Sequence, residues 1–218
     1  MRGANGASSP RPSVKLFRKH RSTLSILFIL LGIRGTLANQ YVVPTGSMIP
    51  TIAIGDRILA NRVAYDLKLP LTNIMLQHIA DPERGDVVVF ESPLNKGLVL
   101  VKRLVAVGGD RVVIENGFIT LNGKRLDDFH GQNSPYRETL GEHTYTVQRL
   151  PRFFRPERRE FIVPPAEFLM FGDNRDNSAD SRVFGFVPRD HLIGRASHVI
   201  YSMNFPQVNF ARFGKRLD

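Results

Sequence analysis

The chain has 218 residues, of which 42% are hydrophobic, and this is enough to bury one main core with a smaller lobe attached. It contains no cysteine, which excludes disulfides, thiolate metal sites and a cysteine nucleophile. The net charge is +10, but residues 1–38 hold seven basic residues and no acidic one. The remainder carries 23 basic against 20 acidic residues, so we do not expect nucleic acid as a partner. The six histidines lack ligand spacing, and we expect neither a metal nor another cofactor.

The N-terminal part predicts a membrane anchor. Residues 1–21 are rich in glycine, serine, proline and positive charge, which indicates a disordered, basic cytoplasmic tail. Residues 22–43 are long enough for one transmembrane helix if the Arg34 side chain reaches an interface. The basic flank stays in the cytoplasm, so residues 44–218 would lie on the outer face. A secretory signal cleaved after Ala38 is the alternative to an uncleaved anchor.

The remainder of the chain predicts mainly β structure. Two runs rich in β-branched residues, 87–90 and 98–107, are joined by a polar loop with proline and glycine. Residues 111–114 and 118–121 predict a hairpin, with a further turn at 122–123. The Asn-Gly pairs at both turns favour the positive φ that tight hairpin turns require.

Residues 127–160 are polar, contain proline and show no regular pattern, so we expect an irregular segment there. The arginine-rich stretch 149–159 predicts a solvated loop, or alternatively a contact with anionic lipid headgroups.

A serine stands in a rigid context in the sequence PTGSMIPT, residues 44–51. Two prolines and a glycine in eight positions exclude a helix and an interior strand, so this stretch is a turn or loop. Taken alone, Ser47 in such a place is more often a turn former than a nucleophile.

Lys102 interrupts an apolar strand face. Strand alternation places Leu98, Leu100, Leu104 and Ala106 on the same side as this lysine, with Arg103 on the opposite side. The simple interpretation is an edge-strand lysine that reaches water. The functional one is an amine whose pKa is lowered by apolar surroundings, so that it serves as a general base.

Ser47 and Lys102 together suggest a catalytic pair. A serine hydroxyl becomes nucleophilic when a base takes its proton, and a desolvated lysine does this without histidine. Thr45, two residues before Ser47, would direct its hydroxyl to the developing oxyanion beside the Ser47 backbone N–H.

Four segments of the chain resemble the conserved boxes of bacterial type I signal peptidases, the membrane-bound serine proteases that remove signal peptides from exported proteins. In chain order they are PTGSMIPTIAIGDRILANR, RGDVVVFESP, VKRLVAVGGDRV and FGDNRDNSADSRVFGFVP. A calcium loop in the last segment is disfavoured, because a loop starting at Asp173 would place Arg175 at its third ligand position.

The resemblance implies roles for individual residues. Ser47 matches the nucleophile, Lys102 the general base, and Thr45 the oxyanion-hole hydroxyl, where many members have serine. Ser178 matches the residue that hydrogen-bonds the lysine. Asp180 and Arg182 match a supporting ion pair.

The resemblance also implies an antiparallel β catalytic domain over residues 44–218, with a small inserted lobe at about 112–163 and one transmembrane helix before it. Its partners would be exported preproteins with signal peptides and the lipid of the bacterial inner membrane. The alternatives are a related peptidase dedicated to one substrate such as a conjugative pilin, a self-cleaving repressor, and a non-catalytic membrane-tethered β module. The repressor would need a helix-turn-helix where residues 1–43 have an apolar run.

Overall fold

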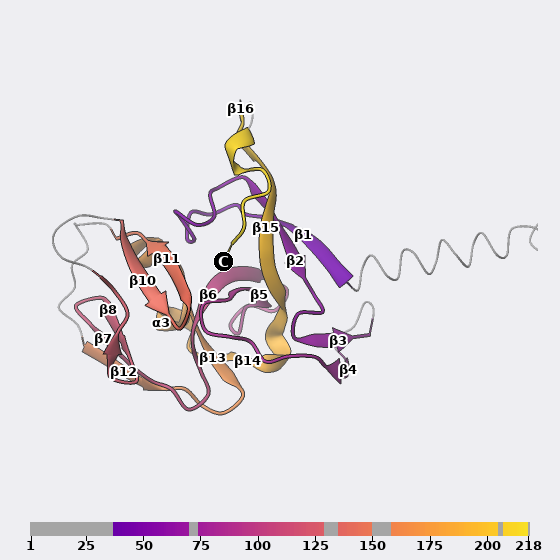
Figure 1. Cartoon of the computed structure of the whole chain (residues 1–218). Helices are drawn as coiled ribbons and strands as arrows, with labels where there is room; N and C mark the ends of the chain where they lie inside the picture. Colours follow the sequence, from indigo (N-terminus) through magenta and orange to yellow (C-terminus); the bar gives the residue numbers. More distant parts are fainter. Residues whose placement is uncertain (1–36, 70–73, 129–134, 150–157, 205–206, 218) are drawn as a thin grey trace, which may run out of the picture.

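One large curled sheet forms the centre of the molecule (Figure 1). The computed structural model describes residues 37–69, 74–128, 135–149, 158–204 and 207–217. The sheet has eight strands in the order β1-β2-β15-β5-β6-β13-β14, with β16 paired to β15 and every pairing antiparallel. Its strands are β1 (Ala38–Val42), β2 (Asp56–Asn61), β5 (Val87–Glu91), β6 (Val99–Val107), β13 (Glu167–Phe171), β14 (Val187–Pro188), β15 (Leu192–Asn204) and β16 (Gln207–Val208).

Three smaller sheets and four short helical turns complete the described part of the chain. A four-stranded sheet contains β12 (Arg158–Ile162), β7 (Arg111–Glu115), β8 (Phe118–Leu121) and β9 (Lys124–Arg125) in that order. The two hairpins are β10 (Tyr136–Leu140) with β11 (His143–Val147), and β3 (Asp66–Lys68) with β4 (Met75–His78). The helical turns are η2 (Arg175–Asn177), α3 (Ser181–Phe184), η3 (Arg189–His191) and η4 (Phe210–Arg212). The predicted class, mainly antiparallel β, is confirmed.

The Asn-Gly turns form as predicted. Asn116 and Gly117 have φ of 52° and 78° between β7 and β8, and Asn122 and Gly123 have φ of 49° and 84° before β9. Positive φ at both central residues matches the right-handed twist of the flanking strands.

The segment predicted to be irregular contains a regular hairpin, so this prediction was wrong for β10 and β11. Alternate residues of β10 are buried, but one of the inward positions is Glu138, which is fully buried. Arg175 binds both carboxylate oxygens of Glu138, and the Tyr145 hydroxyl donates to the same group at 2.8 Å. A charged residue at an inward position hid the alternation that predicts a strand.

The end of the predicted anchor is also corrected. The predicted tail 1–21 and most of the anchor 22–43 lie outside the described residues. Residues Ala38–Val42, however, form β1 and pair along their whole length with β2. None of these five residues is fully buried, and Gln40 and Val42 are exposed, which suits a strand at the edge of the sheet. Among the described residues, no helix is long and apolar enough to cross a membrane.

A β-bulge interrupts the side-chain alternation of β6, the strand that carries Lys102, near its C-terminal end. Leu169 of β13 lies opposite Ala106, but Met170 lies opposite Leu104, so Val105 is an extra residue in β6. Leu104 therefore packs in one core cluster, whereas Ala106 packs in another. Leu98 precedes the strand and is 46% exposed. The predicted common face is thus wrong at both of its ends.

The small lobe shares its core with the large sheet. Val105, Ala106, Leu169 and Phe171 of the large sheet pack in one buried cluster with side chains of the four-stranded sheet and the β10–β11 hairpin. Those partners are Val112, Ile114, Ile119, Leu121, Leu126, Tyr136, Leu140, Tyr145, Val147 and Val163. Burial of this apolar surface on both sides holds the lobe to the sheet.

We predict that Glu138→Ala lowers the free energy of unfolding by about 3–5 kcal/mol, because it leaves the Arg175 guanidinium buried without its partner. Urea denaturation measures the change. Glu142→Ala, in the exposed turn of the same hairpin, is the control and should have little effect. Equal stabilities of the two variants would contradict the structural role of Glu138.

Candidate active site

Ser47 lies on a loop of tight turns fixed to the core. The Ile49 N–H donates to the Gly46 carbonyl at 3.2 Å, and the Ile52 N–H donates to the Met48 carbonyl at 2.9 Å. Met48 and Ile52 are fully buried in the cluster between this loop and the sheet. The two prolines and the glycine thus give a rigid turn, as the sequence predicts.

The structure brings Ser47 and Lys102 together. Lys102 lies in the middle of β6, and its Nζ is 2.6 Å from Ser47 Oγ and 3.1 Å from the Val101 carbonyl oxygen. Lys102 is 3% exposed and Ser47 is 8% exposed. Two residues that are 55 positions apart in sequence therefore form a hydrogen bond with little access to water.

Burial changes the charge state of this lysine. Loss of hydration lowers the pKa of Lys102 to about 8, although the carboxylates of Asp180 and Asp173 act in the opposite direction. At pH 7 about a tenth of the side chains would be neutral, compared with a few parts in ten thousand at the ordinary lysine pKa. The site therefore contains an amine able to accept a proton near neutral pH.

Ser178 lies near the pair, but its predicted bond to the lysine is not present. Its Oγ is buried and has no hydrogen-bond partner among the described residues. The Lys102 amine is directed instead to Ser47 and to the Val101 carbonyl. A Cβ added to Gly172 would come within 2.2 Å of Ser178 Oγ and 2.5 Å of the Ser47 carbonyl oxygen, so this position requires glycine. The orienting role of Ser178 stays a prediction.

Asp180 and Arg182 form an ion pair. Arg182 Nε and Nη2 lie 2.8 and 2.7 Å from the two Asp180 oxygens. The carboxylate also accepts the Gly172 N–H at 3.1 Å and the Arg182 N–H at 3.3 Å, so it caps α3 and holds the chain beside Ser178. Thr45 is exposed, two residues before Ser47, and its role in an oxyanion hole stays a prediction.

The sequence interpretation missed the ion pair beside Lys102. Arg103 and Asp173 are fully buried, and both of their nitrogen–oxygen distances are 2.9 Å. Arg103 also donates to the Gly85 carbonyl at 2.7 Å, and the Thr51 hydroxyl donates to Asp173. A Lys-Arg pair inside an apolar strand was the available signal, because a buried guanidinium requires a carboxylate partner.

A second missed residue, Asn174, holds the loop of Ser47. Its backbone N–H donates to the Ser47 carbonyl and its Nδ2 to the Gly46 carbonyl, both at 3.0 Å. Asn174 follows Asp173 in the chain, so one short segment binds both the loop of Ser47 and the strand of Lys102.

Comparison with known proteins identifies the family of this chain. The family described as signal peptidase, peptidase S26, matches residues 16–201. The signal peptidase I of Pseudomonas aeruginosa is 33% identical over 89% of this chain and 77% of its own. The signal peptidase I of Aquifex aeolicus is 30% identical over 84% of this chain and 83% of its own. A solved signal peptidase I from Enterococcus faecalis is 26% identical, with a TM-score of 0.37 over 54% of this chain and 97% of its own.

The family match spans most of the described residues and includes the loop of Ser47, β6, β13, η2, α3 and η3. The chain therefore belongs to the signal peptidase family, peptidase S26, and is a serine endopeptidase.

Proposed function

We propose that this chain is a membrane-bound endopeptidase that removes N-terminal signal peptides from exported preproteins, with Ser47 as nucleophile and neutral Lys102 as general base. The observation that carries the proposal is the 2.6 Å distance between Lys102 Nζ and Ser47 Oγ in a buried setting. The names of the relatives support the substrate class, because they are called signal peptidase I.

In the first half of the reaction, the neutral amine of Lys102 accepts the proton of the Ser47 hydroxyl as Oγ attacks the scissile carbonyl carbon. The tetrahedral intermediate then collapses, and the Lys102 ammonium gives its proton to the leaving amine. The carbon–nitrogen bond breaks and an ester to Ser47 remains. A lysine pKa of about 8 suits both steps, because the amine is accessible as a base and its ammonium is a competent acid.

In the second half, Lys102 takes a proton from water, and the resulting hydroxide attacks the ester. Ser47 Oγ leaves and receives the proton back from the ammonium. The developing oxyanion in both halves would lie between the Ser47 backbone N–H and the Thr45 hydroxyl. Attachment of the loop through Asn174 supports this assignment, because it fixes the backbone of Ser47 before substrate binds.

We further propose that the N-terminus is cytoplasmic and that the catalytic domain is extracytoplasmic, at the surface of the bacterial inner membrane. The distribution of charge supports this topology, since residues 1–38 have seven basic and no acidic side chains.

The first test of the function is cleavage of a preprotein in detergent by the full chain. Ser47→Ala and Lys102→Arg should both lose cleavage while remaining folded, because alanine has no nucleophile and arginine does not deprotonate. Ser197→Ala, a partly buried serine on β15, is the matched control and should retain activity. Comparable turnover by Ser47→Ala would reject the proposed nucleophile.

The pH dependence tests the state of the lysine. We expect kcat/KM to fall below about pH 8 with a slope of one, because protonation of Lys102 removes the base. Asp180 raises the pKa of Lys102, so Asp180→Asn should shift this limb to lower pH. Asp190→Asn, at an exposed position, should leave it unchanged. A limb that does not move in folded Asp180→Asn would argue against Lys102 as the titrating group.

The oxyanion role of Thr45 is separable from substrate binding. Thr45→Val should lower kcat by about 10²–10³ with little change in KM, because its hydroxyl meets charge that exists only after attack. Thr45→Ser should be nearly unchanged. Steady-state kinetics measures both constants, and an unaltered kcat in Thr45→Val would mean that backbone donors alone hold the oxyanion.

A further inference from the structure

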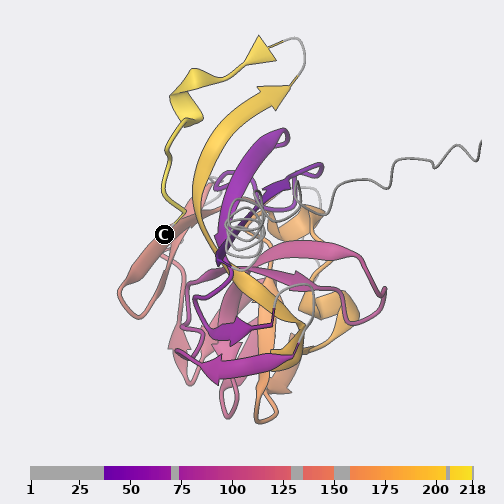
Figure 2. The same cartoon turned by 90° about the vertical axis from the view of Figure 1, so that its right-hand side faces the viewer.

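The C-terminal segment returns to the loop of Ser47. After β16, the chain passes through η4 and runs back beside β15 (Figure 2). The Gly214 N–H donates to the Val199 carbonyl at 2.9 Å, and the Leu217 N–H donates to the Ser197 carbonyl at 3.0 Å. Leu217 is buried in the same cluster as Met48 and Ile52. This segment lies beyond residues 16–201, which match the family.

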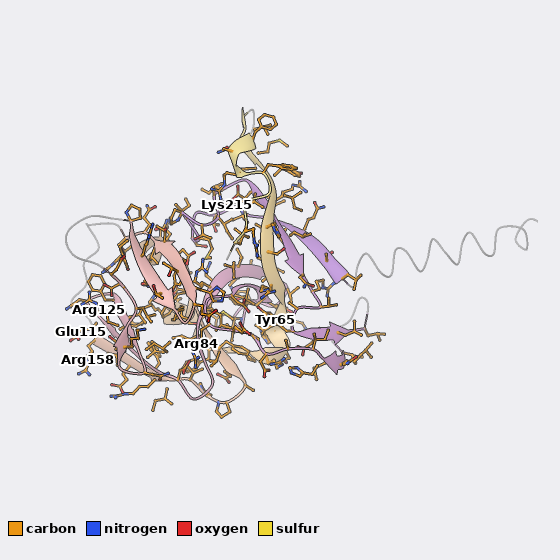
Figure 3. The ribbon with its side chains drawn as sticks, viewed as in Figure 1. Tyr65, Arg84, Glu115, Arg125, Arg158 and Lys215 are labelled. Atoms are coloured by element: carbon orange, nitrogen blue, oxygen red, sulfur yellow. The ribbon has the colours of Figure 1, made fainter. Side chains whose placement is uncertain are left out.

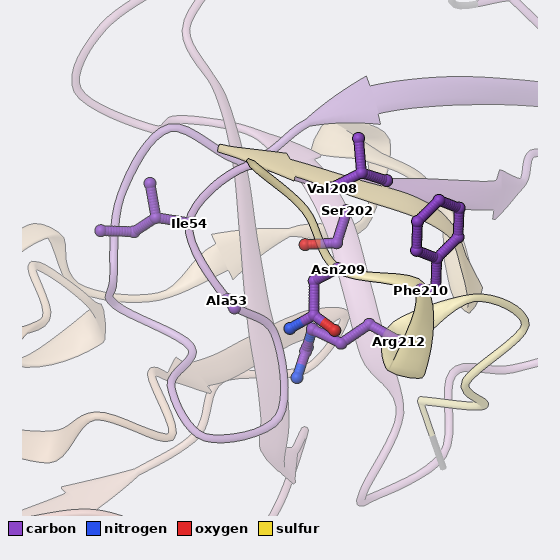
Figure 4. Close-up of a pocket in the computed structure, with 7 residues that line it drawn as sticks. All are labelled: Ala53, Ile54, Ser202, Val208, Asn209, Phe210 and Arg212. Atoms are coloured by element: carbon purple, nitrogen blue, oxygen red, sulfur yellow. The ribbon is translucent and has the colours of Figure 1, made fainter. Parts of the chain in front are cut away.

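Two cations of this segment bind one carbonyl of the serine loop. Arg212 Nη2 and Lys215 Nζ lie 3.0 and 3.1 Å from the Thr51 carbonyl oxygen. Arg212 is fixed by Asp56, whose two oxygens are 2.9 and 3.0 Å from its Nε. Asp56 is fully buried and also accepts the Ala53 N–H at 2.9 Å. Figure 4 shows Arg212 on the C-terminal segment beside the loop that contains Ala53.

The loop of Ser47 is thus held at both ends. At its start, Asn174 binds the carbonyls of Gly46 and Ser47. At its end, the two cations bind the carbonyl of Thr51, and the hydroxyl of Thr51 donates to Asp173. The loop between these attachments is closed by its own turn hydrogen bonds. A shift of Thr51 would therefore move Ser47 relative to the strand of Lys102.

We propose that Arg212 and Lys215 are positioning residues for the peptidase reaction, which clamp the Thr51 carbonyl and so keep Ser47 Oγ in line with the Lys102 amine. The proposal rests on the proposed role of Ser47 as nucleophile. Proton transfer and attack are both sensitive to sub-ångström placement, and a displacement of about 1 Å costs about 10²-fold in rate. The clamp acts on the transition state, so its loss should lower kcat more than it changes KM.

Lys215→Met is the first test, because this side chain lies on the surface and its loss leaves no buried charge. We expect kcat to fall about 3- to 10-fold with KM nearly unchanged, and Lys215→Arg to restore most of the rate. The acidic limb should stay near pH 8, because burial, Asp180 and Asp173 set the pKa of Lys102. Lys124→Met removes an exposed lysine of β9 and should keep full activity. Its neighbour Arg125 lies at the edge of the molecule, apart from Lys215 (Figure 3).

The second test removes both cations. Arg212→Met alone would leave Asp56 buried without a counter-charge, so it is combined with Asp56→Asn and Lys215→Met. We expect this triple variant to lose about 10²-fold in kcat. Asp56→Asn alone shows the cost of the altered carboxylate, and thermal unfolding gives the folded fraction of each variant.

The outcomes separate the two proposals. If Ser47→Ala abolishes cleavage but folded Lys215→Met and the triple variant keep wild-type kcat, the clamp is rejected and the nucleophile stands. The clamp is also rejected if the fall in kcat equals the loss of folded protein. It is rejected likewise if Lys215→Arg loses as much kcat as Lys215→Met. If wild-type cleavage does not depend on Ser47, the proposed function is overturned and the clamp with it.

Discussion

Arg103 and Asp173 form an ion pair from which water is excluded, and two further segments of the chain are hydrogen-bonded to it. The guanidinium also binds the carbonyl of Gly85, and the carboxylate accepts the Thr51 hydroxyl, so each charge has a second hydrogen-bond partner. Removing one partner of a buried pair costs about 3–5 kcal/mol, because the remaining charge would be buried alone. Lys102 directly precedes Arg103 in β6. Asn174, which binds the carbonyls of Gly46 and Ser47, directly follows Asp173. The pair therefore links the strand of Lys102 to the segment that holds the loop of Ser47.

The same pair helps to decide the charge of the lysine. Two carboxylates, Asp180 and Asp173, lie close enough to raise the pKa of Lys102, and each is bound by an arginine. Burial outweighs them, and the pKa remains below its ordinary value. The lobe contributes to this dry environment, since the Tyr145 ring lies 4.0 Å from the Arg103 guanidinium and its hydroxyl binds Glu138. The site thus contains several charges, but those around the amine are already paired.

The fold class and the Asn-Gly hairpins could be predicted from the sequence, because local pattern carries them. The meeting of Ser47 with Lys102 needed the resemblance to signal peptidases as well, since Ser47 alone suits a turn and Lys102 alone suits an edge strand. The β10–β11 hairpin could not, since Glu138 occupies an inward position only because Arg175 reaches it from a distant segment. The bulge at Val105 likewise depends on the register of β13, which no local pattern specifies. The contacts of Thr51 join residues more than 120 positions apart, and only the folded chain brings them together.

β1 fixes the start of the described chain relative to Ser47. It is hydrogen-bonded to β2 from Ala38 onward, and the loop of Ser47 begins a few residues after its end. Five residues of strand span about 17 Å and do not stretch, unlike a flexible tether of the same length. Leu37, the first described residue, is held to the sheet as well, because its carbonyl accepts the Arg62 N–H at 3.0 Å. The separation between that point and Ser47 is therefore set by the fold and not by the length of a flexible linker.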